Sequence, residues 1–317
     1  MVSAFCLAKR RILLLEARAD RSRNLGRHPL ILGARAKSGK IVKVTLFIPC
    51  FVDLMYPQVG ISMVQILERL GHSVECPEEL ACCGQPAFNS GYWDEARAVA
   101  VKVVERLKDA EVVVIASGSC GAMLKVFYVE LFAGTAFAEA AKALSKKCYE
   151  FSDFLVTRLG LTDLGAQFPA KVTFHDGCHG LRELGIKKPP RQLLSKVRGL
   201  ELVEMPEEVC CGFGGTFAAK FPMISTAMGE VKCAAAVETG AEFIVSNDSS
   251  CLMHIQGLLD RQGSKLERGQ TITFPLTVPS PACRANSEFN TPNRRAAADG
   301  GEWRTKRPSC SERTGGR

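Results

Sequence analysis

Short runs of apolar residues alternate along the chain with longer stretches of helical periodicity. Residues 43–50 (KVTLFIPC) form an apolar run rich in β-forming residues, which is typical of a buried strand. In residues 59–71 (VGISMVQILERLG) the apolar positions recur at helical spacing and end at a glycine, which indicates a helix and its terminus. The pattern then predicts a strand at 72–77, an amphipathic helix at 92–108 and a buried strand at 111–116.

The second part of the chain repeats this order of elements. It predicts a strand at 171–178 (KVTFHDGC), a helix near 191–197, a strand at 201–206, a helix at about 218–239 and a strand at 242–247. In each part the next helix is expected to begin at a cysteine, Cys120 or Cys251. Strands that alternate with helices predict an α/β fold of two tandem repeated units, with parallel strands covered by helices.

Cysteines repeat with the same spacing as the predicted elements. Each unit has a lone cysteine, then Cys-Cys-Gly after 31 further residues, then a cysteine nine residues after a glutamate. The first set is Cys50, Cys82, Cys83 and Cys120, and the second set is Cys178, Cys210, Cys211 and Cys251. All eight follow predicted strands, so we expect them at the carboxyl ends of the strands, where α/β folds place their sites.

The charge of the chain is concentrated at its two ends. The formal net charge is +8, but residues 1–40 contribute +8, residues 263–317 contribute +5, and the part between them contributes −5. A mildly acidic folded region gives no support to nucleic-acid binding. We therefore divide the chain into a basic aperiodic extension (1–40) that is disordered or not translated, a first unit (41–150), a second unit (151–262) and a disordered basic tail (263–317).

The remaining composition indicates a protein without a membrane span. The longest apolar stretch, residues 112–137, is interrupted by Lys125 and Glu130, whereas a transmembrane helix needs about 20 nearly uncharged residues. The chain has 14 cysteines and no evident export signal, so we expect a cytoplasmic protein. Thiols stay reduced there, and clusters of them usually bind metal or carry redox chemistry.

Adjacent cysteines followed by glycine are suited to a metal site rather than to a disulfide. Consecutive Cα atoms lie about 3.8 Å apart, less than the roughly 4.4–6.8 Å of a relaxed disulfide. Both side chains can approach one centre only where the chain turns, and the glycine permits a turn with positive φ. Four soft thiolates per unit suit either an iron–sulfur cluster or zinc, and the spacing alone does not decide between them.

Other candidates are weaker. Cys76, Cys148 and Cys233 stand alone and are expected to pack in the core, while Cys6, Cys283 and Cys310 lie in the aperiodic ends. His175 and His179 flank Cys178 and could bind metal, shuttle protons or fill polar positions, but four thiolates already suffice for a metal. Asp176 beside His175 could form an acid–base pair. The GFGG string at 212–215 lacks the spacing of a dinucleotide loop.

Several strings around the cysteines are specific enough to indicate a family. They are LFIPCFVDLMYPQVG, CCGQPAFNSGYWDEAR, SGSCGAM, FHDGCHGLRELG, CCGFGGTFA and NDSSCLMHIQG, and they span about residues 43–262. The chain resembles the CCG cysteine-rich domain family, which includes the CCG-containing chain of heterodisulfide reductase and the iron–sulfur component of glycolate oxidase. Within that family it looks very like the stand-alone two-repeat members, the lactate utilization A proteins.

The resemblance implies an iron–sulfur electron carrier in the oxidation of L-lactate to pyruvate. Its partners would be other lactate-utilization subunits, one of them a second iron–sulfur protein, and the chain would not be catalytic alone. The resemblance assigns one cluster, of the [4Fe-4S] type, to each unit. The implied ligands are Cys50, Cys82, Cys83 and Cys120 in the first unit and Cys178, Cys210, Cys211 and Cys251 in the second.

One departure from the family pattern keeps several alternatives open. The CCG-containing chain of heterodisulfide reductase ends its motif in C-x2-C, and here Ser117 and Asp248 replace the earlier cysteine. An ordinary four-iron cluster in each unit or one metal-free unit both remain possible. The alternatives for function are a zinc-stabilised structural or regulatory subunit, a glycolate oxidase-type subunit and a thiol–disulfide redox subunit.

Overall fold

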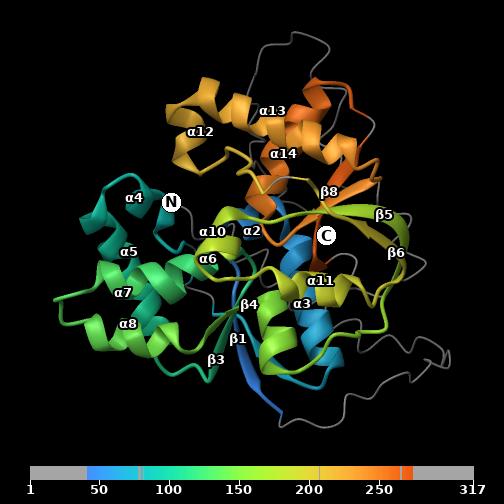
Figure 1. Ribbon diagram of the computed structural model, residues 1–317. Coiled ribbons are helices and arrows are strands. Elements are labelled where there is room, and N and C mark those ends of the chain that lie inside the picture. Colours follow the sequence, from blue (N-terminus) through green and yellow to red (C-terminus); the bar gives the residue numbers. More distant parts are fainter. Residues whose placement is uncertain (1–40, 78–79, 81, 207, 265, 274–317) are drawn as a thin grey trace, which may run out of the picture. The chain divides into compact units, whose positions relative to one another are not determined.

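The structure is a computed structural model that describes residues 41–77, 80, 82–206, 208–264 and 266–273 (Figure 1). All of these residues belong to one compact unit, and the second unit, Pro279–Arg317, lies outside the described residues. The predicted extension at residues 1–40 also lies outside them.

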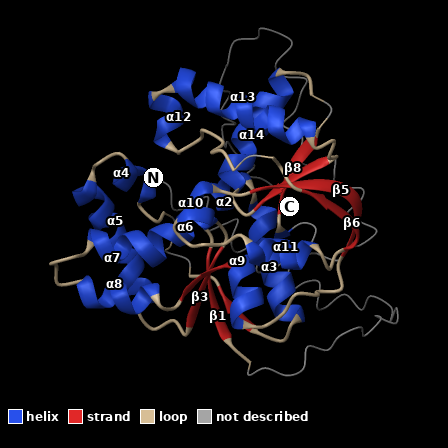
Figure 2. Cartoon of the chain, viewed as in Figure 1, coloured by secondary structure: helices blue, strands red, loops and turns tan. Residues whose placement is uncertain are grey.

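The first repeat is built on a parallel sheet with the strand order β2-β1-β3-β4. Its strands are β1 (Lys43–Phe47), β2 (Ser73–Glu75), β3 (Val112–Ile115) and β4 (Cys148–Glu150). The central strands, KVTLF and VVVI, are mostly apolar and almost completely buried, which is the pattern of a parallel sheet covered on both faces. The helices of Figure 2 surround these strands.

The second repeat has a parallel sheet with the equivalent order, β6-β5-β7-β8. Its strands are β5 (Gln167–His175), β6 (Arg198–Val203), β7 (Phe243–Ser246) and β8 (Glu267–Thr271). The duplication of the cysteine spacing is therefore a duplication of the fold, and the predicted α/β class with two units of parallel strands is confirmed.

Helices connect the strands of each repeat. Those of the first repeat are α2 (Cys50–Met55), α3 (Pro57–Arg69), α4 (Gln85–Asn89), α5 (Trp93–Leu107), α6 (Gly118–Ala122), α7 (Tyr128–Leu131), α8 (Ala138–Ser145) and α9 (Phe151–Asp153), with π-helical turns at Met123–Phe127 and Phe154–Arg158. Those of the second repeat are α10 (Cys178–Arg182), α11 (Lys188–Leu194), α12 (Thr216–Lys220), α13 (Pro222–Glu238) and α14 (Ser249–Arg261).

Three apolar clusters form the core. The largest contains residues of both sheets, such as Val44 of β1 and Val172 of β5, so the two repeats share it. A second cluster lies within the first repeat, and a third lies within the second repeat. Each of these smaller clusters contains two buried cysteines of its own repeat's predicted set, which are described below. These sulfurs are thus held by well-packed surroundings.

Three of the predicted helices have different bounds in the structure. The helix expected at 218–239 is broken at Phe221, which has φ −130° and ψ 59°, because the proline that follows disfavours helical backbone at the preceding residue. The helices expected to begin at Cys120 and Cys251 begin two residues earlier, at Gly118 and Ser249.

The second repeat also extends further than predicted. The sequence places the start of the tail at residue 263, but Glu267–Thr271 form β8 and pair with β7. The run ERGQT is polar and lacks the alternation that marks a strand, so no local pattern indicates it. The rest of the predicted tail, from residue 274, lies outside the described residues.

Candidate metal centre

The four cysteines of the first repeat come together at the carboxyl ends of three strands. Cys50 begins α2 after β1, Cys82 and Cys83 follow β2, and Cys120 lies in α6 after β3. The Sγ atoms of Cys83 and Cys120 are 3.2 Å apart. Cys82 is within hydrogen-bonding reach of both Cys50 and Cys83, so the four sulfurs form a continuous chain of contacts.

The Cys-Cys-Gly turn has the predicted left-handed glycine in both repeats. Gly84 has φ 83° and Gly212 has φ 85°, and each donates its backbone N–H to the sulfur two residues earlier, Cys82 or Cys210, at 3.4 Å. A Cβ at Gly84 would lie 3.2 Å from the carbonyl oxygen of Ala96, and one at Gly212 only 2.5 Å from that of Ser225. Glycine is therefore required for both the turn and the close packing of the next helix.

One sulfur in each repeat is poised to carry negative charge. Hydrogen bonds from Cys50 and Cys83 lower the pKa of Cys82 to about 2, and those from Cys178 and Cys211 lower the pKa of Cys210 to about 2. The donating thiols correspondingly have a raised pKa, Cys50 through its bond to Cys82 and then through burial. Metal binding would remove these remaining protons, since the thiolate is the form that ligates.

The second repeat gathers its cysteines in the same way. Cys178 begins α10 after β5, Cys210 and Cys211 follow β6, and Cys251 lies in α14 after β7. Hydrogen bonding links Cys178 to Cys210, Cys210 to Cys211, and Cys211 to Cys251. The structure thus brings together each set of four that the sequence predicted.

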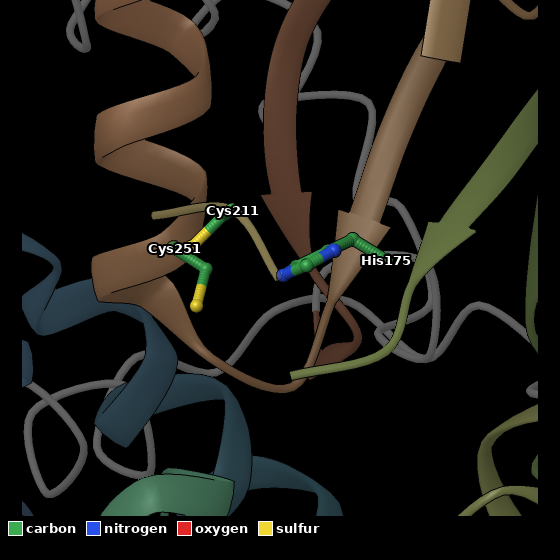
Figure 3. A group of neighbouring side chains, drawn as sticks. All are labelled: His175, Cys211 and Cys251. Carbon is green, nitrogen blue, oxygen red and sulfur yellow. The ribbon is translucent and has the colours of Figure 1, made fainter. Parts of the chain in front are cut away.

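A histidine joins the second set, and among the described residues no histidine groups with the first. A nitrogen of His175 and the sulfurs of Cys211 and Cys251 all lie within 4.8 Å of one another (Figure 3). His175 is fully buried at the end of β5, and neither of its ring nitrogens has a hydrogen-bond partner among the described residues. Burial, reinforced by the positive charge of Lys232, lowers the pKa of His175 to about 3, so the ring is neutral.

The other polar residues near Cys178 have partners of their own. Nδ1 of His179 lies 3.8 Å from the Cys178 sulfur, and its ring packs edge-on against Phe127. Asp176 forms a bidentate ion pair with Arg191, at 2.7 and 2.9 Å. The sequence suggested Asp176 as an acid–base partner of His175, but in the structure its carboxylate is bound by Arg191.

The two residues that replace a cysteine of the family motif connect the repeats. Ser117 caps α6, and its hydroxyl donates a 2.7 Å hydrogen bond to the Asp248 carboxylate. Ser119 donates to the same carboxylate from its backbone N–H at 2.9 Å and from its hydroxyl at 3.0 Å. Asp248 is 2% exposed, and burial raises its pKa in spite of these bonds. The two positions therefore hold the repeats together and supply no thiolate.

The isolated cysteines pack as predicted. Cys148 and Cys233 are fully buried, and Cys76 is partly buried against the shared core. Burial raises the pKa of Cys148 to about 12 and that of Cys233 to about 11, which keeps both as thiols. Cys6, Cys283 and Cys310 lie outside the described residues.

A cleft gives access to the second set of cysteines. Its volume is about 490 Å³, and Cys210 and Gly212 form part of its wall together with Ser90 of the first repeat. Ser90 and Thr216 share a 2.9 Å hydrogen bond between their hydroxyls across this region. Cys210, the sulfur with the lowered pKa, is therefore reachable from solvent.

The donor sets of both repeats fit a soft metal group. Each offers four sulfurs, of which two are buried, and a glycine N–H that already points at one of them. Thiolates of this kind bind iron–sulfur clusters or zinc. The spacing of the cysteines indicates both sets, but the only sequence signal for the proximity of His175 to Cys211 and Cys251 is its position near Cys178.

Comparisons with known proteins agree with this geometry. The family model for the cysteine-rich domain (CCG) matches residues 44–125 and 172–256, which contain all eight cysteines. The chain is 46% identical over 229 residues to lactate utilization protein A 1 of Bacillus mycoides, covering 71% of this chain and 93% of that protein. It is 44% identical to lactate utilization protein A of Bacillus subtilis over 228 residues, 71% of this chain and 95% of that one.

Solved structures show only distant similarity. A glutamate racemase from Bacillus anthracis aligns over 80% of this chain and 82% of its own, with 12% identity and a TM-score of 0.30. A TM-score this low indicates nothing about the site. In the described part of the chain, the helices are too short or too polar to cross a membrane.

Proposed function

The chain belongs to the cysteine-rich domain (CCG) family, and on that premise we propose that it is an iron–sulfur electron-transfer subunit of a system that oxidises L-lactate to pyruvate. The observation that carries the proposal is the gathering of four sulfurs in each repeat at the same edge of equivalent sheets. Apolar packing would be served equally well by valine or alanine, so it does not explain eight cysteines in register.

In this proposal each repeat holds one cluster, of the [4Fe-4S] type. The ligands are Cys50, Cys82, Cys83 and Cys120 in the first repeat and Cys178, Cys210, Cys211 and Cys251 in the second. When bound, such clusters accept and release single electrons at potentials set by their surroundings. The chain's own residues position the thiolates and donate N–H bonds to them, as Gly84 and Gly212 already do.

The chemistry of lactate oxidation fits a chain with two one-electron sites. Converting lactate to pyruvate releases two electrons and two protons, and two sites can hold the two electrons. We assign no catalytic residue to the chain, because the Asp176 carboxylate that could have paired with His175 is bound to Arg191 instead. The dehydrogenation itself then falls to partner subunits, and we place the system, including a second iron–sulfur protein, in the cytoplasm.

Anaerobic purification of the full chain tests the cluster assignment. We expect a brown protein whose visible absorption bleaches with dithionite and which contains about eight iron and eight acid-labile sulfide atoms, about four of each per site. A folded, colourless protein that contains neither iron nor sulfide would refute the assignment. Cys148→Ala protein is the matched control, because it removes a buried thiol that belongs to neither set.

Zinc is the second candidate for the metal. In the second repeat a nitrogen of His175 and the sulfurs of Cys211 and Cys251 lie within 4.8 Å of one another. One tetrahedral ion could bind all three atoms. In that case the cysteines would contribute folding energy to a structural or regulatory subunit. Metal analysis of the same preparation distinguishes the two, because zinc without sulfide supports this second candidate.

The substrate is tested separately from the metal. We expect the chain to restore growth on L-lactate to a Bacillus subtilis strain that lacks its own lactate utilization protein A, to which the chain is 44% identical. Cys211→Ala protein should fail in the same assay, while Cys233→Ala protein should succeed. Rescue of growth on glycolate instead of lactate would favour a glycolate oxidase-type subunit.

A further inference from the structure

The strand that leads to the lone cysteine ends in a different residue in each repeat. Phe47 ends β1 and His175 ends β5, each stands three residues before its cysteine, and each is fully buried. Phe47 packs in the apolar cluster that contains Cys83 and Cys120. An imidazole ring therefore occupies, in the second repeat, the place of a benzyl ring in the first.

The imidazole is directed at the sulfurs of its own repeat. Figure 3 shows the ring extending from the strand end toward Cys211 and Cys251, with which it shares the 4.8 Å grouping. Neither ring nitrogen has a hydrogen-bond partner among the described residues. A buried polar group left without a partner costs about 1–3 kcal/mol, so its retention beside two thiols points to a bound group that completes its bonding.

Resting on the iron–sulfur function proposed above, we propose that His175 donates an N–H···S hydrogen bond to the sulfur of the group held by the second repeat, and that this bond gives the second site a higher reduction potential than the first. Direct ligation through nitrogen is disfavoured by two observations. Four thiolates already complete the set, and a ligating ring would bury its other N–H without an acceptor among the described residues. If the ring instead donates its N–H to a sulfur, only the other ring nitrogen, which is an acceptor, stays without a partner.

A buried lysine strengthens the same difference. The Cys-Cys-Gly glycine packs against Ala96 of α5 in the first repeat and against Ser225 of α13 in the second. These two residues are 129 positions apart, and the same offset makes Lys232 the equivalent of Val103. Val103 and Lys232 are each 2% exposed. Reduction adds negative charge, so a hydrogen-bond donor and a nearby cation both favour the reduced state of the second site.

A redox titration of the full chain, loaded anaerobically and followed by electron paramagnetic resonance, tests the proposal. Wild-type protein should show two separate midpoint potentials. In His175→Phe protein the reduction equilibrium of the higher-potential site should shift about tenfold toward the oxidised form, which is about 59 mV for one electron, while the lower-potential site stays unchanged. His175→Gln protein should recover most of the shift, because the glutamine amide can donate an N–H.

Two further measurements remain informative if the His175→Phe protein fails to fold. Phe47→His protein introduces a donor into the first repeat and should raise the lower potential. Pulsed resonance on protein labelled with ¹⁵N-histidine should show a weak nitrogen coupling that His175→Gln removes. The strong coupling of a directly bound nitrogen would overturn hydrogen-bond donation in favour of ligation.

The outcomes separate this inference from the proposed function. Wild-type protein without iron and sulfide would overturn both. Iron-loaded His175→Phe protein whose two midpoints equal those of wild type would overturn only the role of His175. Loss of iron from the second repeat alone in this variant would show that the ring holds the metal, and would also overturn the assignment of a hydrogen-bond donor.

Discussion

The two repeats place their sulfurs in the same way but surround them with side chains of different polarity. Phe47, Val103 and Met123 are buried apolar residues of the cluster that contains Cys83 and Cys120 of the first set. The equivalent positions of the second repeat, found from the offsets of the cysteines and of the Cys-Cys-Gly contacts, hold His175, Lys232 and His254.

This difference shows that different parts of the fold determine the positions of the sulfurs and the polarity of the side chains around them. The geometry follows from strand order and from the Cys-Cys-Gly turn, which both repeats keep. The environment follows from side chains on the strand ends and on the helix after the turn, which can change without moving the sulfurs. Hydrogen bonds and charge near the sulfurs tune a metal group, so the two repeats are suited to different potentials.

The largest effect is expected from removing a buried cysteine of one repeat. Cys83→Ala should abolish metal binding in the first repeat and Cys211→Ala in the second, because each removes one of the four ligands and leaves the metal group incompletely coordinated. Each variant should therefore retain about half of the iron and sulfide of wild type, measured per chain, whereas Cys233→Ala should retain all of it. Complete loss from either variant would mean that the sites are not separable.

The Cys-Cys-Gly glycines should differ in their tolerance of a side chain. Alanine at Gly84 should lower the free energy of unfolding by about 1–2 kcal/mol, which is the cost of left-handed backbone. Its Cβ would lie 3.2 Å from a carbonyl oxygen, a contact that a small shift relieves. Alanine at Gly212 should cost roughly 3 kcal/mol or more, because its contact is 2.5 Å and forces α13 to shift. Urea unfolding of the two variants measures the difference, and equal costs would contradict it.

A pH effect on stability should arise in the first repeat. Glu150, at the end of β4, is 2% exposed, and burial raises its pKa to about 7 although Ser152 and the backbone N–H of Asp153 donate to it. Between its unfolded pKa of about 4.5 and 7 the folded state binds the proton more tightly. The free energy of unfolding should therefore fall by up to about 3 kcal/mol as the pH rises from 4.5 through 7.

The measurement that isolates this effect is the difference between wild type and Glu150→Gln. Glutamine does not titrate, so the unfolding free energy of the variant should lack this component of the slope between about pH 4.5 and 7.5. In the second sheet β8 ends in Thr271, which does not titrate either. A wild type and variant with parallel pH profiles would show that Glu150 has an ordinary pKa.

Effects of about 1–2 kcal/mol, at the lower end of this series, are expected at the positions that join the repeats. Asp248→Ala should cost about 2 kcal/mol, because it leaves the buried hydroxyl of Ser117 and the partly buried donors of Ser119 without their acceptor. Ser117→Ala should cost about 1 kcal/mol, the value of a helix cap. Asp248→Asn keeps an oxygen acceptor and should therefore cost less than Asp248→Ala in thermal unfolding, and the reverse order would contradict this account.

The repeat, the α/β class and the grouping of the cysteines could be predicted from the sequence because they depend on spacing and on runs of β-forming residues. The left-handed glycine could be predicted because two adjacent sulfurs need a turn. In contrast, β4 has only three residues and β8 is polar, so neither produces a recognisable pattern. Both strands exist because an exposed edge of the sheet offers them hydrogen bonds, which is a tertiary effect.

The parts of the site that the sequence does not reveal involve contacts between distant residues. The sequence places His175 on a predicted strand beside Cys178, but it does not show that the ring lies next to Cys211 and Cys251, which are far along the chain. In the sequence, Asp248 stands where the family motif has a cysteine and so suggests only that a ligand is missing. In the structure its carboxylate accepts a hydrogen bond from Ser117 of the other repeat. Aligning the repeats sets Phe47 opposite His175, yet only the packing shows that both face the sulfurs.

The contact between α6 and α10 has a consequence for electrical communication. A Cβ on Gly118 would lie 3.2 Å from the Cα of Gly180, so the two helices touch through their backbones. Gly118 is two residues from Cys120, and Gly180 is two residues from Cys178, so each helix brings one sulfur donor of its set to this crossing. Charge gained on one side would be felt across a short, poorly screened path, and the first electron to arrive would make the second harder to add.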